Sequence, residues 1–382
     1  MNYSHLLVLF ALKEDNWRRR LPTGKQILRK LSAIIPVALV FLSSVSAAPA
    51  DVTWSVLFDQ TITTTYSLRG VALSADNSKV YGTWLATGVN KLIVEYNATT
   101  GAVLNSSTIP YTGSSAQAKS IATDDRGYVY LGSGDGSGAF LPTQIQIRSS
   151  DLQTTYAAVS TTDAATKDKR IGGASVWKNG DQYYLYITRE SGFGSGYIQR
   201  FNVTDRAQPV LDTGFGTGGT FDLQSLFPGD LFVGFLRGLV VATDGTIYVA
   251  STQTDSAANK ANSRVYKIAA NLGSAIYTNV RGAMDVTILG SKLYVSQYDA
   301  QNSAVAVLNA SNLSLVRTLI TGFNHSNTSA DSGYSGIDIT RDGRIFVADQ
   351  VYNTSFTNRL LVSSPVYFGK TVPAINSLLL DD

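Results

Sequence analysis

The sequence predicts an all-β fold, a six-bladed β-propeller of four-stranded antiparallel blades, and three observations lead to it. A short unit that reads as strand, tight turn and strand recurs six times along the 382 residues. Each unit is followed by alternating runs that supply a third and, except in the sixth unit, a fourth strand. The chain offers a spare strand, "VTWSVLFDQ" from Val52, which would complete the sixth unit and close the ring. Radial packing of such repeats hides the sheet edges.

The six units supply the two innermost strands of each blade. In chain order they are "RGVALSADNSKVYGTW" from Arg69, "KSIATDDRGYVYLGS" from Lys119, "GGASVWKNGDQYYLYITRE" from Gly172, "RGLVVATDGTIYVAS" from Arg237, "RGAMDVTILGSKLYVSQ" from Arg281 and "SGIDITRDGRIFVADQ" from Ser335. Apolar and polar residues alternate with period two, and Asp-Gly or Asn-Gly turns provide the positive φ that a short hairpin requires. Runs such as "KLIVEYNATTG" and "RVYKIAANLG" are the expected third strands, and "AVLNSST" and "SLVRTLI" are expected fourth strands.

Two of these units also resemble a known repeat. "GIDITRDGRIFVADQ" followed by "TNRLLV", and "GLVVATDGTIYVAS" followed by "NSRVYKI", resemble NHL-type propeller repeats. The sixth unit follows that pattern nearly throughout, whereas the fourth has Ser251 in place of an aspartate and the third has a different turn at Asn179-Gly180-Asp181. The resemblance implies a propeller scaffold, and a scaffold does not specify a function.

The first fifty residues are typical of a signal peptide or signal anchor with a long basic n-region. Seven basic and two acidic residues give residues 1–50 a charge of +5, which leaves −2 of the overall +3 for residues 51–382. A basic stretch ends at Arg29-Lys30, the apolar run "LSAIIPVALVFL" follows, and "SSVSAAPA" suits cleavage near Ala47 or Ala48. A misassigned start codon and an uncleaved anchor are the alternatives. Residues 51–382 are then a single propeller domain without an apolar run long enough to span a bilayer.

Export is further suggested by Asn-x-Ser/Thr acceptors for N-glycosylation, although Ser/Thr-rich sequence also produces such triplets by chance. They occur at Asn97, Asn105, Asn202, Asn309, Asn312, Asn324, Asn327 and Asn353. The chain has no cysteine, so burial and strand pairing must hold the fold together. We expect a secreted, extracellular glycoprotein that is monomeric, and nucleic acid is not an expected partner because the propeller has no basic excess.

A basic residue stands near the start of the innermost strand in five units: Arg69, Lys119, Arg170, Arg237 and Arg281. A ring of such groups around the central channel would bind an anionic ligand, because guanidinium groups fit carboxylates and phosphates. The alternative is inter-blade salt bridges, since loops on the same upper face contain Asp135, Glu190, Asp255, Asp299 and Asp349. Trp84, Tyr298 and Tyr334 belong to the upper face too, where aromatic rings either stack on sugars or peptides or cap the core.

Asp285 and Asp338 are expected at equivalent positions of two innermost strands, in "MDVT" and "IDIT". Buried carboxylates need partners, so they either hold a cation in the channel or accept hydrogen bonds from adjacent backbone. Six-bladed propellers that the sequence resembles include calcium-dependent lactonases, and this resemblance implies a channel cation for which Asp285, Asp338 and Asn279 are the candidates. The mature chain has one histidine, His325, so histidine-based catalysis or a multi-histidine zinc site is not expected.

The sequence therefore favours a secreted, non-enzymatic binding or scaffold propeller. Its ligand would be a glycan, peptide or small anion on the upper face, and its partner an extracellular glycan, protein or small molecule. The alternative is a calcium-dependent hydrolase of the lactonase or esterase type with the metal in the central channel. No catalytic residue is assigned, no cofactor is required, and calcium is the one candidate ion.

Overall fold

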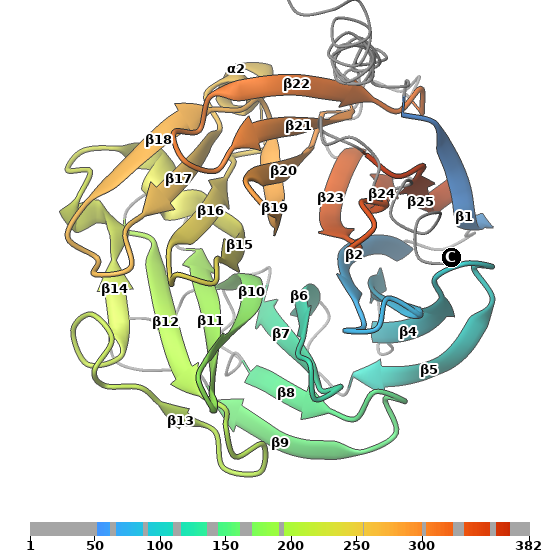
Figure 1. The fold of residues 1–382 in the computed structure, drawn as a ribbon, viewed down its shortest axis with the longest axis horizontal. Helices are drawn as coiled ribbons and strands as arrows, with labels where there is room; N and C mark the ends of the chain where they lie inside the picture. Colours follow the sequence, from blue (N-terminus) through green and yellow to red (C-terminus); the bar gives the residue numbers. More distant parts are fainter. Residues whose placement is uncertain are drawn as a thin grey trace, which may run out of the picture. The chain divides into compact units, whose positions relative to one another are not determined.

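The computed structural model describes residues 52–61, 66–86, 91–109, 116–135, 144–160, 170–190, 195–254, 256–299, 303–323, 332–351 and 357–366. The compact unit Val52–Val366 is a ring of six antiparallel sheets, which confirms the predicted six-bladed propeller (Figure 1). Residues 1–51 and 367–382 lie outside the described residues, as do the acceptor asparagines Asn324, Asn327 and Asn353.

The first three blades follow the chain from its innermost to its outermost strand. Blade 1 consists of β2 (Tyr66–Leu73), β3 (Lys79–Ala86), β4 (Lys91–Asn97) and β5 (Val103–Ile109). Blade 2 consists of β6 (Ala116–Thr123), β7 (Val129–Asp135), β8 (Gln144–Arg148) and β9 (Thr155–Ser160). Blade 3 consists of β10 (Arg170–Asn179), β11 (Gln182–Glu190), β12 (Tyr197–Asn202) and β13 (Val210–Leu211), and β12 also pairs with β14 (Thr220–Asp222). The outermost position of this blade is thus shared by two short strands.

The remaining blades close the ring. Blade 4 consists of β15 (Leu236–Val241), β16 (Ile247–Ser251), β17 (Arg264–Ile268) and β18 (Ala275–Asn279). Blade 5 consists of β19 (Ala283–Leu289), β20 (Lys292–Gln297), β21 (Ala304–Asn309) and β22 (Leu315–Ile320). Blade 6 consists of β23 (Ser332–Ile339), β24 (Ile345–Val351), β25 (Thr357–Ser363) and β1 (Trp54–Thr61), so the predicted spare strand completes the last blade. Short helical turns lie at η2 (Leu223–Ser225), η3 (Leu231–Phe235) and α2 (Ala257–Ala261).

The inner hairpins turn as the sequence predicts. In blade 4, Gly245 has φ +84°, and the Asp244 carboxylate accepts a hydrogen bond of 2.9 Å from the Thr246 N–H. In blade 3, Gly180 has φ +59°. Glycine adopts these angles without steric cost, and the aspartate satisfies a turn N–H, which suits these residue types to the two turns.

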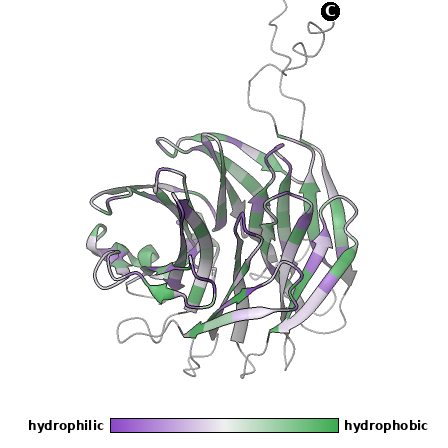
Figure 2. Ribbon diagram, turned by 60° about the horizontal axis from the view of Figure 1, so that its bottom comes forward, coloured by the Kyte–Doolittle hydropathy of each residue, from purple (hydrophilic) through white to green (hydrophobic). Residues whose placement is uncertain are grey.

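The core lies between neighbouring blades. One buried cluster combines Tyr248 and Val265 of blade 4 with Val286 and Val295 of blade 5. Apolar segments run along the strands of the ring in Figure 2, interrupted by polar residues with the alternation of a pleated strand. Because the chain has no cysteine, this packing and the strand ladders provide the cohesion of the ring.

Every innermost strand has a β-bulge, and the bulges form the narrow waist of the channel. The residue on the channel side of the bulge is Gly70, Ser120, Gly173, Gly238, Asp285 and Gly336 in blades 1 to 6. A Cβ atom added at Gly173 would lie 2.6 Å from the Gly238 Cα, and one at Gly336 would lie 2.7 Å from the Arg69 carbonyl oxygen. Glycine is needed here because the backbones of adjacent blades meet.

Candidate functional site

Among the described residues, the central channel contains two small cavities. One lies at the bulges, is lined by residues that include Arg69, Arg237 and Asp285, and measures about 30 Å³, which is enough for about two water molecules. The other lies towards the hairpin ends, is lined by residues that include Thr287 and Asp338, and measures about 130 Å³. Ligand pockets usually enclose at least roughly 300 Å³, so both cavities are smaller than a usual ligand pocket.

Asp285 occupies the waist because it stands where four other blades have glycine. One carboxylate oxygen accepts a hydrogen bond of 2.9 Å from the Val286 N–H, and the other accepts one of 3.2 Å from the Ile337 N–H of blade 6. Burial inside the ring raises the pKa of Asp285 to about 7; the two N–H donors oppose this rise, and the charge of Asp338 adds to it. This carboxylate connects blade 5 to blade 6.

Asp338 connects three blades. Its Oδ2 atom accepts a hydrogen bond of 2.8 Å from the Leu73 N–H of blade 1. Its Oδ1 atom accepts hydrogen bonds of 3.1 Å from the Thr287 hydroxyl of blade 5 and 2.8 Å from the Ile339 N–H of its own blade. Burial raises the pKa of Asp338 as well. Because blades 6 and 1 meet where the ring closes, this side chain stabilises the contact between the first and the last blade.

The two aspartates are not at equivalent positions, which corrects the expectation from "MDVT" and "IDIT". Strand pairing aligns Val286 and Val295 of blade 5 with Ile337 and Val347 of blade 6. Asp285 therefore corresponds to Gly336, and Asp338 lies two residues further along the channel. The shared Asp-x-Thr pattern is misleading because the residue that follows the one-residue bulge is Asp285 itself in blade 5 and Gly336 in blade 6.

The predicted basic ring is divided among several structural roles. The Arg237 guanidinium forms a buried ion pair with Glu190 of blade 3 and donates a hydrogen bond of 3.1 Å to the Thr252 carbonyl. Arg281 pairs with Asp299 of its own blade. Arg69 lies in the β2 bulge and donates from Nε to the Ser67 hydroxyl over 3.1 Å. The side chains of Lys119 and Arg170 lie outside the described part of the chain.

These contacts separate the two interpretations of the basic residues. The predicted inter-blade salt bridge exists for Arg237, whereas the Arg281 pair lies within one blade. Arg237 and Arg281 are therefore already neutralised by carboxylates of the protein, which weakens an anion site at this ring.

The three predicted ligand-stacking rings are buried, which corrects the expectation that they offer a surface to a ligand. Trp84 is 2% exposed and donates from its indole nitrogen to the Tyr96 hydroxyl over 2.8 Å. The Tyr298 hydroxyl accepts a hydrogen bond of 2.9 Å from the Gln350 amide, and the Tyr334 hydroxyl contacts that of Thr321. Large rings with a satisfied polar atom pack the core, which was the alternative for this group.

The described glycosylation acceptors differ in how their amide nitrogens are used. Asn105 donates from its amide nitrogen to Glu95 over 2.8 Å, and Asn309 donates to the Ser314 hydroxyl over 2.7 Å. Asn97, Asn202 and Asn312 instead use their side-chain oxygens to accept backbone N–H groups in turns. Asn312 is exposed.

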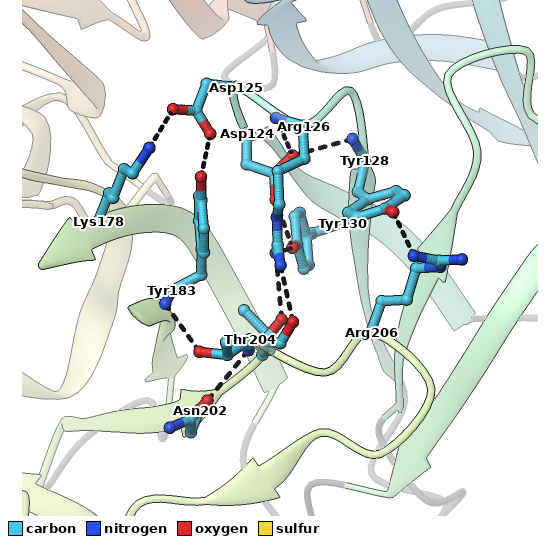
Figure 3. A network of polar contacts seen from close by, with 11 residues as sticks. Asp124, Asp125, Arg126, Tyr128, Tyr130, Lys178, Tyr183, Asn202, Thr204 and Arg206 are labelled. Carbon is cyan, nitrogen blue, oxygen red and sulfur yellow. Dashed lines mark hydrogen bonds and ion pairs between the residues drawn. The ribbon is translucent and has the colours of Figure 1, made fainter. Parts of the chain in front are cut away.

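A polar network on the hairpin face was not found from the sequence. Its centre is Arg126, which bonds Asp124 and the carbonyls of Val203 and Thr204 in blade 3 at 2.8, 3.1 and 2.8 Å (Figure 3). The guanidinium lies 3.6 Å from the centre of the Tyr183 ring. The sequence does contain a sign of this network: among the six inner turns, only "TDDRG" has a second acidic residue followed by an arginine.

Comparison with known proteins shows the fold. No model of a known protein family matches the sequence, and no curated protein matches it. A protein of unknown function from Dyadobacter fermentans is 8% identical, with a TM-score of 0.56 over 83% of this chain and 98% of its own. A gluconolactonase from Xanthomonas campestris is 14% identical, with a TM-score of 0.52 over 85% and 92% of the two chains. Regucalcin from Agrobacterium tumefaciens, a calcium-binding protein, is 11% identical, with a TM-score of 0.51 over 81% and 92%.

The chain is thus a six-bladed β-propeller, and its solved neighbours include enzymes as well as proteins of unknown function. Within the described residues, no three acidic, histidine or cysteine side chains come together as metal ligands. The same part of the chain contains no helix with the length and apolar character needed to cross a membrane.

Proposed function

We propose that this chain is a secreted binding or scaffold propeller that holds a glycan, a peptide or a small anion on the upper face of its ring. The observation that carries the proposal is the channel: its cavities measure about 30 and 130 Å³, and its two carboxylates are tied to backbone N–H groups of neighbouring blades. Among the described residues the channel offers no cavity of the usual ligand size, which favours a ligand that binds on a face of the ring. The NHL-type pattern of the sixth unit supports a scaffold, and the ion pairs of Arg237 and Arg281 favour an uncharged glycan or peptide over an anion.

A glycan array followed by hydrogen–deuterium exchange tests this function. The full chain is screened against glycans, peptides and small anions. A ligand that binds the folded state raises the midpoint of thermal unfolding, because it adds about 2.7 kcal/mol to the free energy of unfolding when its concentration is one hundred times its Kd. The bound ligand should protect the segments that join second and third strands, and leave the Asp244-Gly245 turn unprotected. Protection confined to the hairpin turns would place the ligand elsewhere and reject the proposal.

The alternative function, a calcium-dependent hydrolase, is favoured by one observation, namely that Asp285 and Asp338 both line the channel. Calcium takes six to eight oxygen ligands, and the described channel residues supply two carboxylates that already accept backbone hydrogen bonds. This donor set fits a calcium ion poorly. Thermal unfolding of the full chain with calcium and then with a chelator separates the functions: the binding protein shows no shift, and a calcium shift that Asp285→Asn or Asp338→Asn abolishes would establish a calcium site in the channel. Calcium-dependent hydrolysis of lactones or esters by the same protein would then support the hydrolase.

Secretion is part of the proposal and has its own test. The leader is cleaved near Ala47 or Ala48, and the exposed turn residue Asn312 carries a glycan. Asn105 remains unmodified because its amide nitrogen is bonded to Glu95 inside the sheet. N-terminal sequencing and glycopeptide mass spectrometry of the protein from the culture medium measure both properties. Retention of the leader inside the cell, or a glycan on Asn105 and none on Asn312, would contradict these statements.

A further inference from the structure

The inner hairpin of blade 3 turns at an exposed asparagine–glycine pair. Strand β10 ends at Asn179, which is paired with Gln182 of β11, so Gly180 and Asp181 form a two-residue turn. Gly180 has φ +59° and Asp181 has no positive φ, as in a type II′ turn. Every residue from Lys178 to Gln182 is exposed. Asn179-Gly180 is the one Asn-Gly pair in the sequence of 382 residues.

The Asn179 side chain is free to rotate. Among the described residues, none forms a hydrogen bond with its amide group. Two other exposed turn asparagines differ in this respect. The side-chain oxygen of Asn271 accepts a hydrogen bond of 3.0 Å from the Gly273 N–H, and that of Asn312 accepts one of 3.0 Å from the Ser314 N–H. Such bonds fix the direction of the side chain, whereas the Asn179 amide can turn towards the backbone of the next residue.

The residue that follows Asn179 leaves the approach to its backbone nitrogen open. A Cβ atom added at Gly180 would have no heavy atom within 4 Å, and no group of the described residues accepts the Gly180 N–H. The two comparison asparagines are followed by Leu272 and Leu313, whose side chains hinder a reaction at their own nitrogens. Glycine has no side chain and adopts backbone angles that other residues avoid.

We propose that Asn179 is a site of spontaneous deamidation, a covalent change to which asparagine is prone. The Gly180 nitrogen gives its proton to solvent and attacks the Asn179 Cγ atom. A C–N bond forms, and the side-chain nitrogen takes up a proton and leaves as ammonia. Water then opens the cyclic succinimide at either carbonyl, which gives aspartate or isoaspartate at position 179. Water is the co-reactant, and no atom is oxidised or reduced.

The strand pairing limits the rate of this reaction. In an extended strand the side chain and the peptide nitrogen of the next residue diverge, so the pair of Asn179 and Gln182 must open before the ring forms. This pair is the last of the β10–β11 ladder, and the ends of a ladder open most readily. We therefore expect deamidation in the folded chain, at a lower rate than in the unfolded chain.

Both products change the turn. They replace a neutral amide by a carboxylate in a turn that already contains Asp181. Isoaspartate also adds a methylene group to the main chain, and a two-residue turn does not tolerate this without loosening the strand pairing. The next pair of the ladder is Lys178 and Tyr183, and both side chains bond Asp125 of blade 2. The change would thus reach the contact between blades 2 and 3, and it goes beyond the proposed function because it requires no ligand.

The test follows the full chain during storage at neutral and at alkaline pH, with pepsin digestion in acid to stop the reaction. Mass spectrometry should show conversion at Asn179 at least about tenfold faster than at Asn271 or Asn312, which corresponds to about 1.4 kcal/mol in the barrier. The rate should rise with pH, because the Gly180 nitrogen must lose its proton. An isoaspartate-specific methyltransferase should label the stored chain. Equal conversion of the three asparagines, or conversion without isoaspartate, would overturn the site.

Variants and a denaturant provide the controls. Asn179→Gln should abolish the methyltransferase label, and the matched control Asn312→Gln should leave it unchanged. Gly180→Ala should slow the conversion, although φ +59° strains an alanine. A comparison of this variant with wild type in urea removes the effect of the fold, and Gly180→Ala should still react more slowly. If Asn179 of the wild type converts in urea but not in the folded chain, the hairpin protects it and the proposal is overturned. None of these outcomes depends on a ligand at the upper face.

Discussion

Replacing Asp285 by asparagine removes the carboxylate at the narrowest part of the ring without changing the shape of the side chain. The amide is uncharged at every pH, as the protonated acid is, but its NH2 group leaves one of the N–H groups of Val286 and Ile337 without an acceptor. That loss is the same at every pH, so the pH dependence of the stability difference comes from the ionisation of Asp285. A comparison of the two proteins isolates the free energy of ionising this one group.

The magnitude follows from the pKa. Burial raises the pKa of Asp285 to about 7, against about 3.9 for an unfolded aspartate, so the native state binds the proton more tightly. Wild-type stability is fully present below about pH 4 and declines as the pH rises through 7. At 1.36 kcal/mol per pH unit the loss amounts to about 4 kcal/mol. Asp285→Asn escapes this loss, so its stability relative to wild type should rise by about 4 kcal/mol between pH 4 and pH 8.5.

Urea unfolding of both proteins at half-unit steps from pH 4 to pH 8.5 provides the measurement, with tyrosine and tryptophan fluorescence as the signal. Asp244→Asn is the matched control, because hydrogen bonding to Thr246 lowers the pKa of Asp244. Its stability relative to wild type should be constant above pH 5 and change only in more acidic solution, with the opposite sign. If the free energy of unfolding of Asp285→Asn minus that of wild type does not vary with pH, the reasoning is refuted. If this stability difference instead decreases with rising pH in the presence of calcium, a cation keeps the Asp285 carboxylate ionised.

Three further predictions concern contacts between blades. Gly238→Ala places a Cβ atom 1.7 Å from an Asp285 carboxylate oxygen and should lower the free energy of unfolding by about 1–3 kcal/mol. In a double-mutant cycle, adding Asp285→Gly should recover part of this loss, and strictly additive effects would contradict the contact. Arg237→Met removes the guanidinium that forms a buried ion pair with Glu190 and should lower the stability by about 3–5 kcal/mol at pH 7, measured by urea unfolding. An effect below 1 kcal/mol would mean that solvent reaches the pair. Arg126→Lys keeps the charge but loses most of the bonds to blade 3, so stability should fall by about 1–3 kcal/mol, and hydrogen exchange should rise at the turn after β12; an unchanged exchange rate would assign that turn to other contacts.

The blade count and the closure of the ring could be predicted because they depend on local signals. Alternation with period two specifies a pleated strand, and turns such as Asp244-Gly245 require a positive φ that few residues adopt. A first strand without a partner and a last blade without its fourth strand leave one way to pair both edges. These features depend on residues close together in the chain, or on a count of strands.

The roles of individual side chains could be predicted only in part. Both interpretations of Arg237 were open until the structure placed Glu190 beside it. Trp84 is an aromatic residue near a loop in the sequence, yet its ring is 2% exposed, because blade 6 covers it through Phe58. The partner in each case comes from a different blade, and its distance along the chain gives no sign of the contact.

The sequence by itself determined that this protein is a closed ring of six four-stranded blades, because each repeat contains the alternating apolar and polar residues of its strands and the residues that its tight turn requires. Only the tertiary structure decided what lies inside the ring. One inserted residue in each innermost strand sets which side chain faces the channel, and so Asp285 takes the place of a glycine while Asp338 lies two residues further along. The stagger between neighbouring blades then supplies the N–H donors for both carboxylates. Such long-range contacts arise only when the ring closes, and the residue order of a single blade does not specify them.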